Sequence, residues 1–234
     1  MVNRFIIHSK NLHYALKWVL FNYNKLRKQL ESQGYYAIQI YKIFLWKKTA
    51  KYFKVFDESG EAFFVKVQSD NKVLYEYQAF QHMESCNSDK SRFYPKIFCS
   101  STGLFSYNVF EALDGKRINK KMILDFDFIK QFLDIVLFFD KVKIIHRDIR
   151  PHNIVVVNKK VKVIDFEHCS INNKKSDNNS KELNKDFSPN GAIWDDAYSF
   201  KKILDYYINQ DKLKDSSNYE MLSKMIGKNT YGYN

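Results

Sequence analysis

The stretch IIHRDIRPHNIVVVNKKVKVIDFEHC, residues 144–169, decides how this chain is interpreted. A polar loop that contains Asp148 and Asn153 precedes a β-branched run, and a second apolar run ends at Asp165. The two runs predict a short β-hairpin after the polar loop. Carboxylate and amide oxygens are ligands that suit a hard cation such as Mg²⁺, and a carboxylate can also orient an attacking hydroxyl. An ordinary hairpin needs none of these polar residues at these spacings, so the stretch predicts a reactive site.

This pattern resembles the catalytic core of the protein-kinase-like superfamily, in which H-R-D-L-x-x-x-N is followed by D-F-G. The resemblance implies phosphoryl transfer, a reaction that depends on positioning and on charge neutralisation. It assigns Asp148 as the catalytic base, and Asn153 and Asp165 as ligands of Mg²⁺. Arg150 would stabilise charge in the transition state. The preceding His146 and Arg147 are expected to have structural roles in the loop.

A lysine in the first half of the chain extends the resemblance. Lys66 lies inside the apolar run 62–67, where a buried lysine is costly unless it is paired. The local sequence F-V-K-V is similar to the V-A-I-K pattern of kinases, which implies that Lys66 holds the phosphates of ATP. Glu76, on a helix expected over 72–83, is its implied partner, and Glu84 is the second choice. The alternative is that Lys66 is an edge-strand lysine that faces water.

The segment F-E-A-L-D-G-K, residues 110–116, resembles the link between the two lobes of a kinase. The resemblance implies that Phe110 lies behind the adenine of ATP. It also implies that the carbonyl of Glu111 and the amide of Leu113 face the edge of the adenine. The alternative is a plain exit from a strand into a loop.

Three features depart from the family pattern. Residues 44–50, between the first two expected strands, contain no glycine. Lys47 and Lys48 are therefore expected to supply charge to the phosphates in place of a glycine-rich loop. Glu167 replaces the glycine of D-F-G, which favours one fixed conformation, and no A-P-E motif is present. Because of these departures, the chain resembles compact atypical kinases, such as bacterial lipopolysaccharide and O-antigen sugar kinases and RIO-like kinases. The resemblance covers residues 36–208.

The expected fold class is α+β, with the two lobes of a kinase-like fold. A small antiparallel N-lobe is expected over 36–112 and a reduced helical C-lobe over 113–234, after an N-terminal helical extension, 1–35. The periodicity predicts strands over 36–45, 50–57, 62–67, 93–100 and 106–111, and helices over 8–33, 72–83, 122–142 and 192–204. The polar tract 172–186 has the composition of a mobile loop, and the tail 228–234 is expected to carry no structure of importance.

The helix over 192–204 includes D-A-Y-S-F, which is similar to the start of a buried helix in kinases. The resemblance implies that Asp196 braces the backbone of the catalytic loop, while Asp195 caps the helix. The alternative is that both are simply acidic residues at a helix N-terminus.

The helix over 8–33 has a stripe of apolar residues on one face and basic residues on its other faces. The stripe consists of Leu12, Leu16, Val19, Tyr23, Leu26 and Leu30. We expect this stripe to pack on its own domain. The alternative is that the helix lies on a membrane surface.

The composition bounds the setting of the protein. The 234 residues carry a net charge of +12, which indicates either an anionic partner or the codon bias of an AT-rich genome. The three cysteines are scattered and are expected to be free thiols in a cytoplasm. No apolar run approaches the roughly 18 residues that span a bilayer, and the first ten residues lack the apolar core of a signal peptide. We expect a cytoplasmic protein. The alternative is a peripheral protein on the inner face of a membrane.

The expected function is an ATP- and Mg²⁺-dependent kinase that phosphorylates a hydroxyl of a cell-envelope saccharide. A serine/threonine protein kinase, with a protein hydroxyl as acceptor, and a catalytically inactive binding module are the alternatives. An anionic membrane surface is a further candidate partner, and nucleic acid is not expected to be one.

Overall fold

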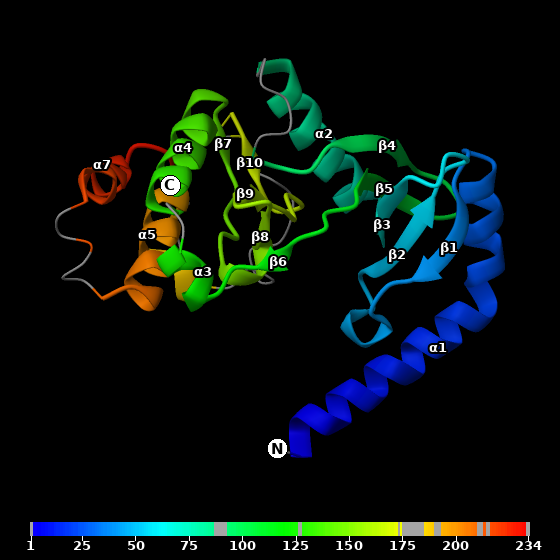
Figure 1. Ribbon diagram of the computed structural model, residues 1–234. Coiled ribbons are helices and arrows are strands. Elements are labelled where there is room, and N and C mark those ends of the chain that lie inside the picture. The colour runs from blue at the N-terminus through cyan, green and yellow to red at the C-terminus, as the bar shows by residue number, and fades with distance from the viewer. Residues whose placement is uncertain are drawn as a thin grey trace. The chain divides into compact units, whose positions relative to one another are not determined.

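The computed structural model describes residues 2–86, 93–125, 128–172, 174, 185–189, 193–209, 213 and 216–232, and it has an α+β fold (Figure 1). The chain divides into two compact units. The first consists of Met1–Tyr77 and Lys96–Ala112, and the second of Gln78–Pro95 and Leu113–Asn234. The division falls within helix α2 (Asp70–Cys86).

The first unit is built on an antiparallel sheet of five strands in the order β1-β2-β3-β5-β4. The strands are β1 (Tyr36–Ile40), β2 (Lys51–Phe56), β3 (Ala62–Gln68), β4 (Ile97–Ser101) and β5 (Ser106–Glu111). Alternate residues of β2 and β3, such as Phe53, Val55 and Val65, are fully buried, as expected for a sheet with one face in a core. The turn Asp57–Gly60 joins β2 to β3, and Gly60 has the positive φ that glycine tolerates.

Helix α1 (Val2–Glu31) supplies the other side of that core and is longer at its start than predicted. Ala15, Leu26 and Leu30 pack against the sheet in one hydrophobic cluster. The prediction that Leu12 and Leu16 belong to the buried stripe is wrong, because both side chains are exposed. Consecutive helical residues are about 100° apart around the axis, so that Leu16 points away from the face on which Ala15 is buried.

The connection from β1 to β2 differs from the predicted strand 36–45. The strand ends at Ile40, Lys42 takes a left-handed backbone conformation, and Ile43–Leu45 form the 3₁₀ turn η1. Trp46 then inserts into the core, where its ring lies 5.7 Å from that of Trp18 on α1. The left-handed residue interrupts the extended backbone that a longer strand would need.

The second unit combines short strand pairs with helices. Its three-stranded sheet has the order β6-β8-β9, and two further pairs are β7 with β10 and β11 with β12. The strands are β6 (Lys116–Arg117), β7 (Ile144–Ile145), β8 (Ile154–Val157), β9 (Lys160–Val163), β10 (Ser170–Ile171), β11 (Ile193–Asp195) and β12 (Thr230–Gly232). The helices are α3 (Lys120–Asp125), α4 (Phe128–Lys141), α5 (Asp196–Tyr207) and α7 (Ser217–Met225), with 3₁₀ turns at η2 (Pro151–Asn153) and η4 (Lys185–Phe187).

Three expectations for this unit change. The helix expected over 192–204 is preceded by strand β11, and the segment expected over 122–142 forms two helices, α3 and α4. The tail, expected to lack important structure, forms strand β12, which pairs antiparallel with β11. Most of the polar tract 172–186 lies outside the described residues. In the part of the chain that the structure describes, no helix is both long and apolar enough to cross a membrane.

Candidate active site

The polar loop 146–153 lies between β7 and β8 and is braced by Asp196 at the start of α5. The Asp196 carboxylate accepts hydrogen bonds from the backbone N–H groups of His146 (2.6 Å) and Arg147 (3.1 Å). Burial raises the pKa of Asp196 to about 7. Asp195 caps α5 by accepting from the backbone N–H of Tyr198 at 3.0 Å. Both roles agree with the sequence-based expectation for these two aspartates.

His146 links the loop to the segment that follows β9 and carries Asp165. Its Nδ1 accepts a hydrogen bond from the backbone N–H of Asp148 at 3.3 Å. Its Nε2 must then carry the proton and donate to the carbonyl of Ile164 at 3.1 Å. Burial lowers the pKa of His146 to about 4, so the ring is neutral at physiological pH. A neutral imidazole with both ring nitrogens in hydrogen bonds fits the structural role predicted for His146.

Asp148 is the buried carboxylate at the centre of the loop. Its Oδ2 accepts a hydrogen bond from Asn153 Nδ2 at 2.8 Å and pairs with Arg150 Nη2 at 3.0 Å. Within the described residues, its Oδ1 has no hydrogen-bond partner although it is buried. Burial raises the pKa of Asp148 to about 6, against the opposing effect of Arg150 and with a further rise caused by Asp165. A buried acceptor without a hydrogen-bond partner costs about 1–3 kcal/mol, and such atoms occur at catalytic sites and also where water is bound.

Asn153 and Asp165 offer oxygens to a cation. Nδ2 of Asn153 donates to two acceptors of Asp148, the carbonyl at 2.9 Å and Oδ2 at 2.8 Å, so Oδ1 is the atom that can face a cation. Asp165 follows β9 with a φ of 74°, a strained conformation of the kind that clusters at functional sites. The N–H of Ile164 donates to the carbonyl of Asn153 at 3.0 Å and ties the two segments together.

These two oxygen ligands fit Mg²⁺, which is usually held by one or two protein carboxylates together with substrate phosphates and water. In the described ranges, no group of three His, Cys, Asp or Glu side chains could hold a metal ion by itself. A metal at this place would therefore depend on ligands that arrive with the substrate.

The three residues after Asp165 are buried. The Phe166 ring lies 5.2 Å from that of Phe80 and 4.6 Å from that of His146. Glu167 pairs with Nε2 of His168 at 3.2 Å and does not have a positive φ. Nothing in this backbone requires a glycine at position 167.

Arg147 is held by the C-terminal strand, a connection that the sequence interpretation missed. Its buried guanidinium lies 4.4 Å from the ring centre of Tyr231 and 5.7 Å from that of Trp194. It also donates to the carbonyl of His168 at 3.3 Å. Nearby, Asn229 Nδ2 donates to the carbonyl of Ile144 at 3.0 Å. No local pattern predicts these contacts, because the partners lie far apart in the sequence.

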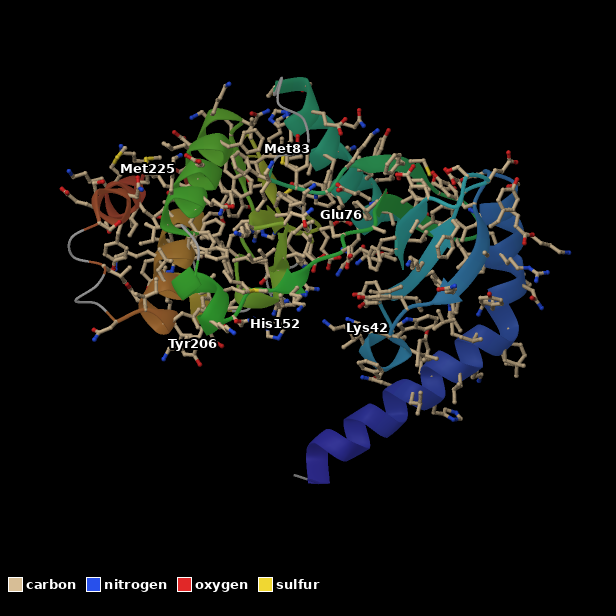
Figure 2. The ribbon with its side chains drawn as sticks, in the orientation of Figure 1. Lys42, Glu76, Met83, His152, Tyr206 and Met225 are labelled. Atoms are coloured by element: carbon tan, nitrogen blue, oxygen red, sulfur yellow. The ribbon has the colours of Figure 1, made fainter. Side chains whose placement is uncertain are left out.

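In the first unit, Lys66 and Glu76, the latter labelled in Figure 2, form a buried ion pair. Lys66 Nζ lies 3.2 Å from Oε2 and 3.3 Å from Oε1 of Glu76. The alternative of an edge-strand lysine is wrong, since β3 lies between β2 and β5 and Lys66 is buried. Asn108, the cross-strand neighbour of Lys66, donates from Nδ2 to the carbonyl of Val73 at 3.1 Å and to Glu76 at 3.5 Å. Asn108 was missed, although a buried asparagine opposite Lys66 follows from the register of the strands.

The remaining predicted nucleotide-binding residues lie at strand ends. Phe110 is buried in β5, and Glu111 ends this strand with its N–H bonded to the carbonyl of Lys96 at 2.9 Å. Leu113, two residues later, is half-buried and belongs to the second unit. Lys47 and Lys48 are exposed in a tight turn after Trp46. The structure thus brings Lys66 and Glu76 together in one unit, and Asp148, Arg150, Asn153 and Asp165 in the other.

The sequence matches no family model and no curated protein.

Proposed function

We propose that this protein is an ATP-dependent phosphotransferase with a two-lobed, protein-kinase-like fold. The observation that carries the proposal is Asp148, a buried carboxylate held through Oδ2 by Asn153 and Arg150, whose Oδ1 is left without a partner in the described structure. A fully satisfied carboxylate would indicate a structural role, whereas an oriented and unsatisfied oxygen suits acceptance of a proton. The Lys66–Glu76 pair supports the same proposal, because it resembles the pair that positions ATP phosphates in kinases.

Each residue has a role in the proposed reaction. Asp148 Oδ1 accepts the proton of the acceptor hydroxyl while the hydroxyl oxygen forms a bond to the γ-phosphorus and the bond to ADP breaks. Asn153 and Asp165 would hold Mg²⁺. Arg150, which pairs with Asp148, balances charge that develops on the phosphoryl group. Lys66, held by Glu76, binds the phosphates of ATP, and the backbone of Glu111 and Leu113 meets the adenine. When bound, Mg²⁺–ATP supplies the phosphoryl group and neutralises charge between the phosphates.

The acceptor we propose is a hydroxyl of a cell-envelope saccharide. A protein kinase binds its peptide substrate with the segment and helices that follow the aspartate corresponding to Asp165. After Asp165, the two helices for which the structure describes both ends, α5 and α7, have 12 and 9 residues. A sugar needs a smaller recognition surface than a folded protein. A serine/threonine protein kinase is the alternative that the same catalytic residues would serve.

Transfer of radiolabelled γ-phosphate to a panel of oligosaccharides and protein acceptors tests the proposal. Asp148→Asn should lower turnover by about 10²–10⁴-fold, the usual contribution of a catalytic base. Asp140→Asn, which removes the same charge from an i,i+3 ion pair on the surface of α4, should retain turnover. Near-normal transfer by the Asp148 variant would refute the assignment. Transfer to protein serine or threonine, with none to any sugar, would establish the alternative acceptor.

A further inference from the structure

The positive charge of this protein is concentrated in its first 56 residues. This segment contains eleven lysine and arginine residues and a single acidic residue, Glu31, which gives +10 of the chain's +12. The other 178 residues therefore carry a net charge of only +2. A codon bias would raise the lysine content along the whole chain without removing acidic residues from one part of it. The concentration therefore favours an anionic partner that meets this segment.

Helix α1 also carries exposed apolar residues outside the cluster that packs on the sheet. Leu12, Leu16 and Leu20 follow each other at four-residue spacing, and all three are exposed. Leu20 is 77% exposed and the adjacent Phe21 is 61% exposed. Side chains four residues apart on a helix are neighbours on its surface, so the three leucines form an apolar strip, while Phe21 is turned about 100° from Leu20 around the helix axis. Contiguous exposed apolar surface marks an interaction site more often than a scatter of single residues does.

Turn η1 adds an exposed aromatic residue beside α1. Trp46 holds η1 against α1, because its ring packs on that of Trp18 at 5.7 Å. Phe44 is 63% exposed. Lys42, labelled in Figure 2, precedes the turn, Lys47 and Lys48 follow it, and all three are exposed.

Basic residues surround the apolar strip. On α1 these are Lys17, Lys25, Arg27 and Lys28, and all four are exposed. Arg27 pairs with Glu31, at 3.5 Å, the only acidic residue of the helix. A helix with apolar residues flanked by lysine and arginine, and too charged to span a bilayer, has the features of helices that lie in the plane of an anionic membrane surface.

We infer that the outer face of α1, with turn η1, docks on the surface of a bilayer that contains anionic phospholipids. Leu16, Leu20, Phe21 and Phe44 enter the boundary between headgroups and acyl chains, while the flanking basic residues meet the phosphates. A nucleic acid would satisfy the basic residues but would leave the leucine strip in water. A second copy of the chain would bring +10 against +10 across the contact, which opposes self-association.

Co-sedimentation of the full-length protein with vesicles tests this inference. The protein should bind vesicles of phosphatidylcholine mixed with phosphatidylglycerol, bind phosphatidylcholine alone weakly, and lose binding as salt screens the charges. Leu20→Glu combined with Phe21→Glu should lower the partition coefficient about tenfold or more, because it removes apolar contact and adds negative charge. Lys17→Gln combined with Lys28→Gln should weaken binding to the anionic vesicles and leave the weak binding to phosphatidylcholine unchanged.

The matched control is Tyr206→Glu combined with Met221→Glu. It adds the same charge at two exposed apolar positions on helices of the second unit. This variant should bind the anionic vesicles nearly as well as the wild type, and thermal melts should show that all variants are folded. Asp148→Asn should bind normally, so that a failure of the catalytic proposal does not affect this test.

Three results would overturn the inference. The first is no binding to the anionic vesicles, and the second is an equal loss of binding in the control variant. The third is a folded dimer, or a complex with single-stranded nucleic acid, that no longer forms in the Leu20→Glu, Phe21→Glu variant although this variant still binds vesicles.

Discussion

The environment of Asp148 leads to the most specific prediction about activity. Its pKa is raised to about 6, first by burial and in addition by Asp165. A carboxyl accepts a proton only when it is ionised, so this group is competent above about pH 6 and becomes protonated below that value. An unperturbed aspartate would stay ionised down to about pH 4.

The first prediction concerns the pH dependence of turnover. The rate constant of phosphoryl transfer should fall about tenfold for each pH unit below about pH 6, measured in single-turnover reactions with saturating Mg²⁺–ATP. Asp140→Asn should show the same acidic limb as the wild type. A limb centred near pH 4 would show that Asp148 is not the group that limits the reaction.

Lys66 and Glu76 form a buried ion pair, and the loss of one partner should lower the free energy of unfolding. Both side chains are buried, and their charged atoms lie 3.2 Å apart. Removal of one charge leaves the other in an environment of low polarity, and such changes cost about 3–5 kcal/mol.

The second prediction is therefore that Glu76→Gln lowers the free energy of unfolding by about 3 kcal/mol or more, whereas Lys66→Met with Glu76→Leu recovers most of the loss. Urea unfolding would measure both. Asp134→Asn, which breaks the more exposed pair with Lys130, should cost less than about 1 kcal/mol. A double variant as unstable as Glu76→Gln would show that the charge left behind is not the cause.

At the scale of secondary-structure elements, strand β12 supports the polar loop 146–153. It pairs with β11, whose last residue, Asp195, also caps α5 and accepts from the N–H of Gly227 at 2.7 Å. Tyr231 of β12 covers the guanidinium of Arg147. Arg147 itself has a φ of 69°, a conformation that costs free energy and persists only where the surroundings enforce it.

The third prediction is that Tyr231→Ala lowers kcat by about tenfold or more and changes KM for ATP little, because a desolvated cation–π contact contributes about 2 kcal/mol. Tyr231→Phe keeps the ring and should retain kcat. A purely structural role would lower the thermal stability without this separation of kcat from KM. Equal loss in both variants would show that the hydroxyl, and not the ring, holds the loop.

The contact between β6 and β8 depends on a glycine. A Cβ at Gly115 would lie 2.6 Å from Val155 Cγ1 and 2.7 Å from the carbonyl oxygen of Val156. The backbone oxygen cannot move aside as a flexible side chain could, so a larger residue must displace β6.

The fourth prediction is that Gly115→Ala lowers the free energy of unfolding by about 1–3 kcal/mol, the usual cost of overpacking. Chemical denaturation would measure it, with Asp114→Ala at the exposed neighbouring position as the control. Equal stability of the two variants would contradict the close approach.

For the whole molecule, ligand binding provides a test that does not depend on knowing the acceptor. A ligand that binds only the folded state stabilises it by about 2.7 kcal/mol at a concentration 100 times its Kd. The fifth prediction is that Mg²⁺–ATP raises the melting temperature, and that Lys66→Met or Asp165→Ala reduces this shift. Melts of each variant without ligand are the control. No shift in the wild type at millimolar Mg²⁺–ATP would favour the inactive binding module.

Local features of the sequence determined much of the framework. The bounds of β5 were predicted correctly, and β2 and β3 were predicted to within one residue at each end, because alternation of apolar residues and the turn at Asp57–Gly60 act over a few neighbours. The same locality explains why Glu76 could be chosen over Glu84. The apolar residues around Glu76 on α2 turn its carboxylate inward toward β3.

Only the tertiary structure decided which part of the apolar stripe of α1 is buried, because the sheet covers Leu26 and Leu30 and leaves Leu12 and Leu16 exposed. It also decided that Tyr231 covers Arg147 and that Asn108 joins the Lys66–Glu76 pair. These contacts join residues that lie 32 to 84 positions apart, and their formation depends on loop closure and packing between elements. Periodicity within one element carries no information on such partners, so Tyr231 and Asn108 could not be predicted from the sequence, whereas Glu76 and Asp196 could; the catalytic and metal-binding roles of Asp148, Asn153 and Asp165 stay predictions.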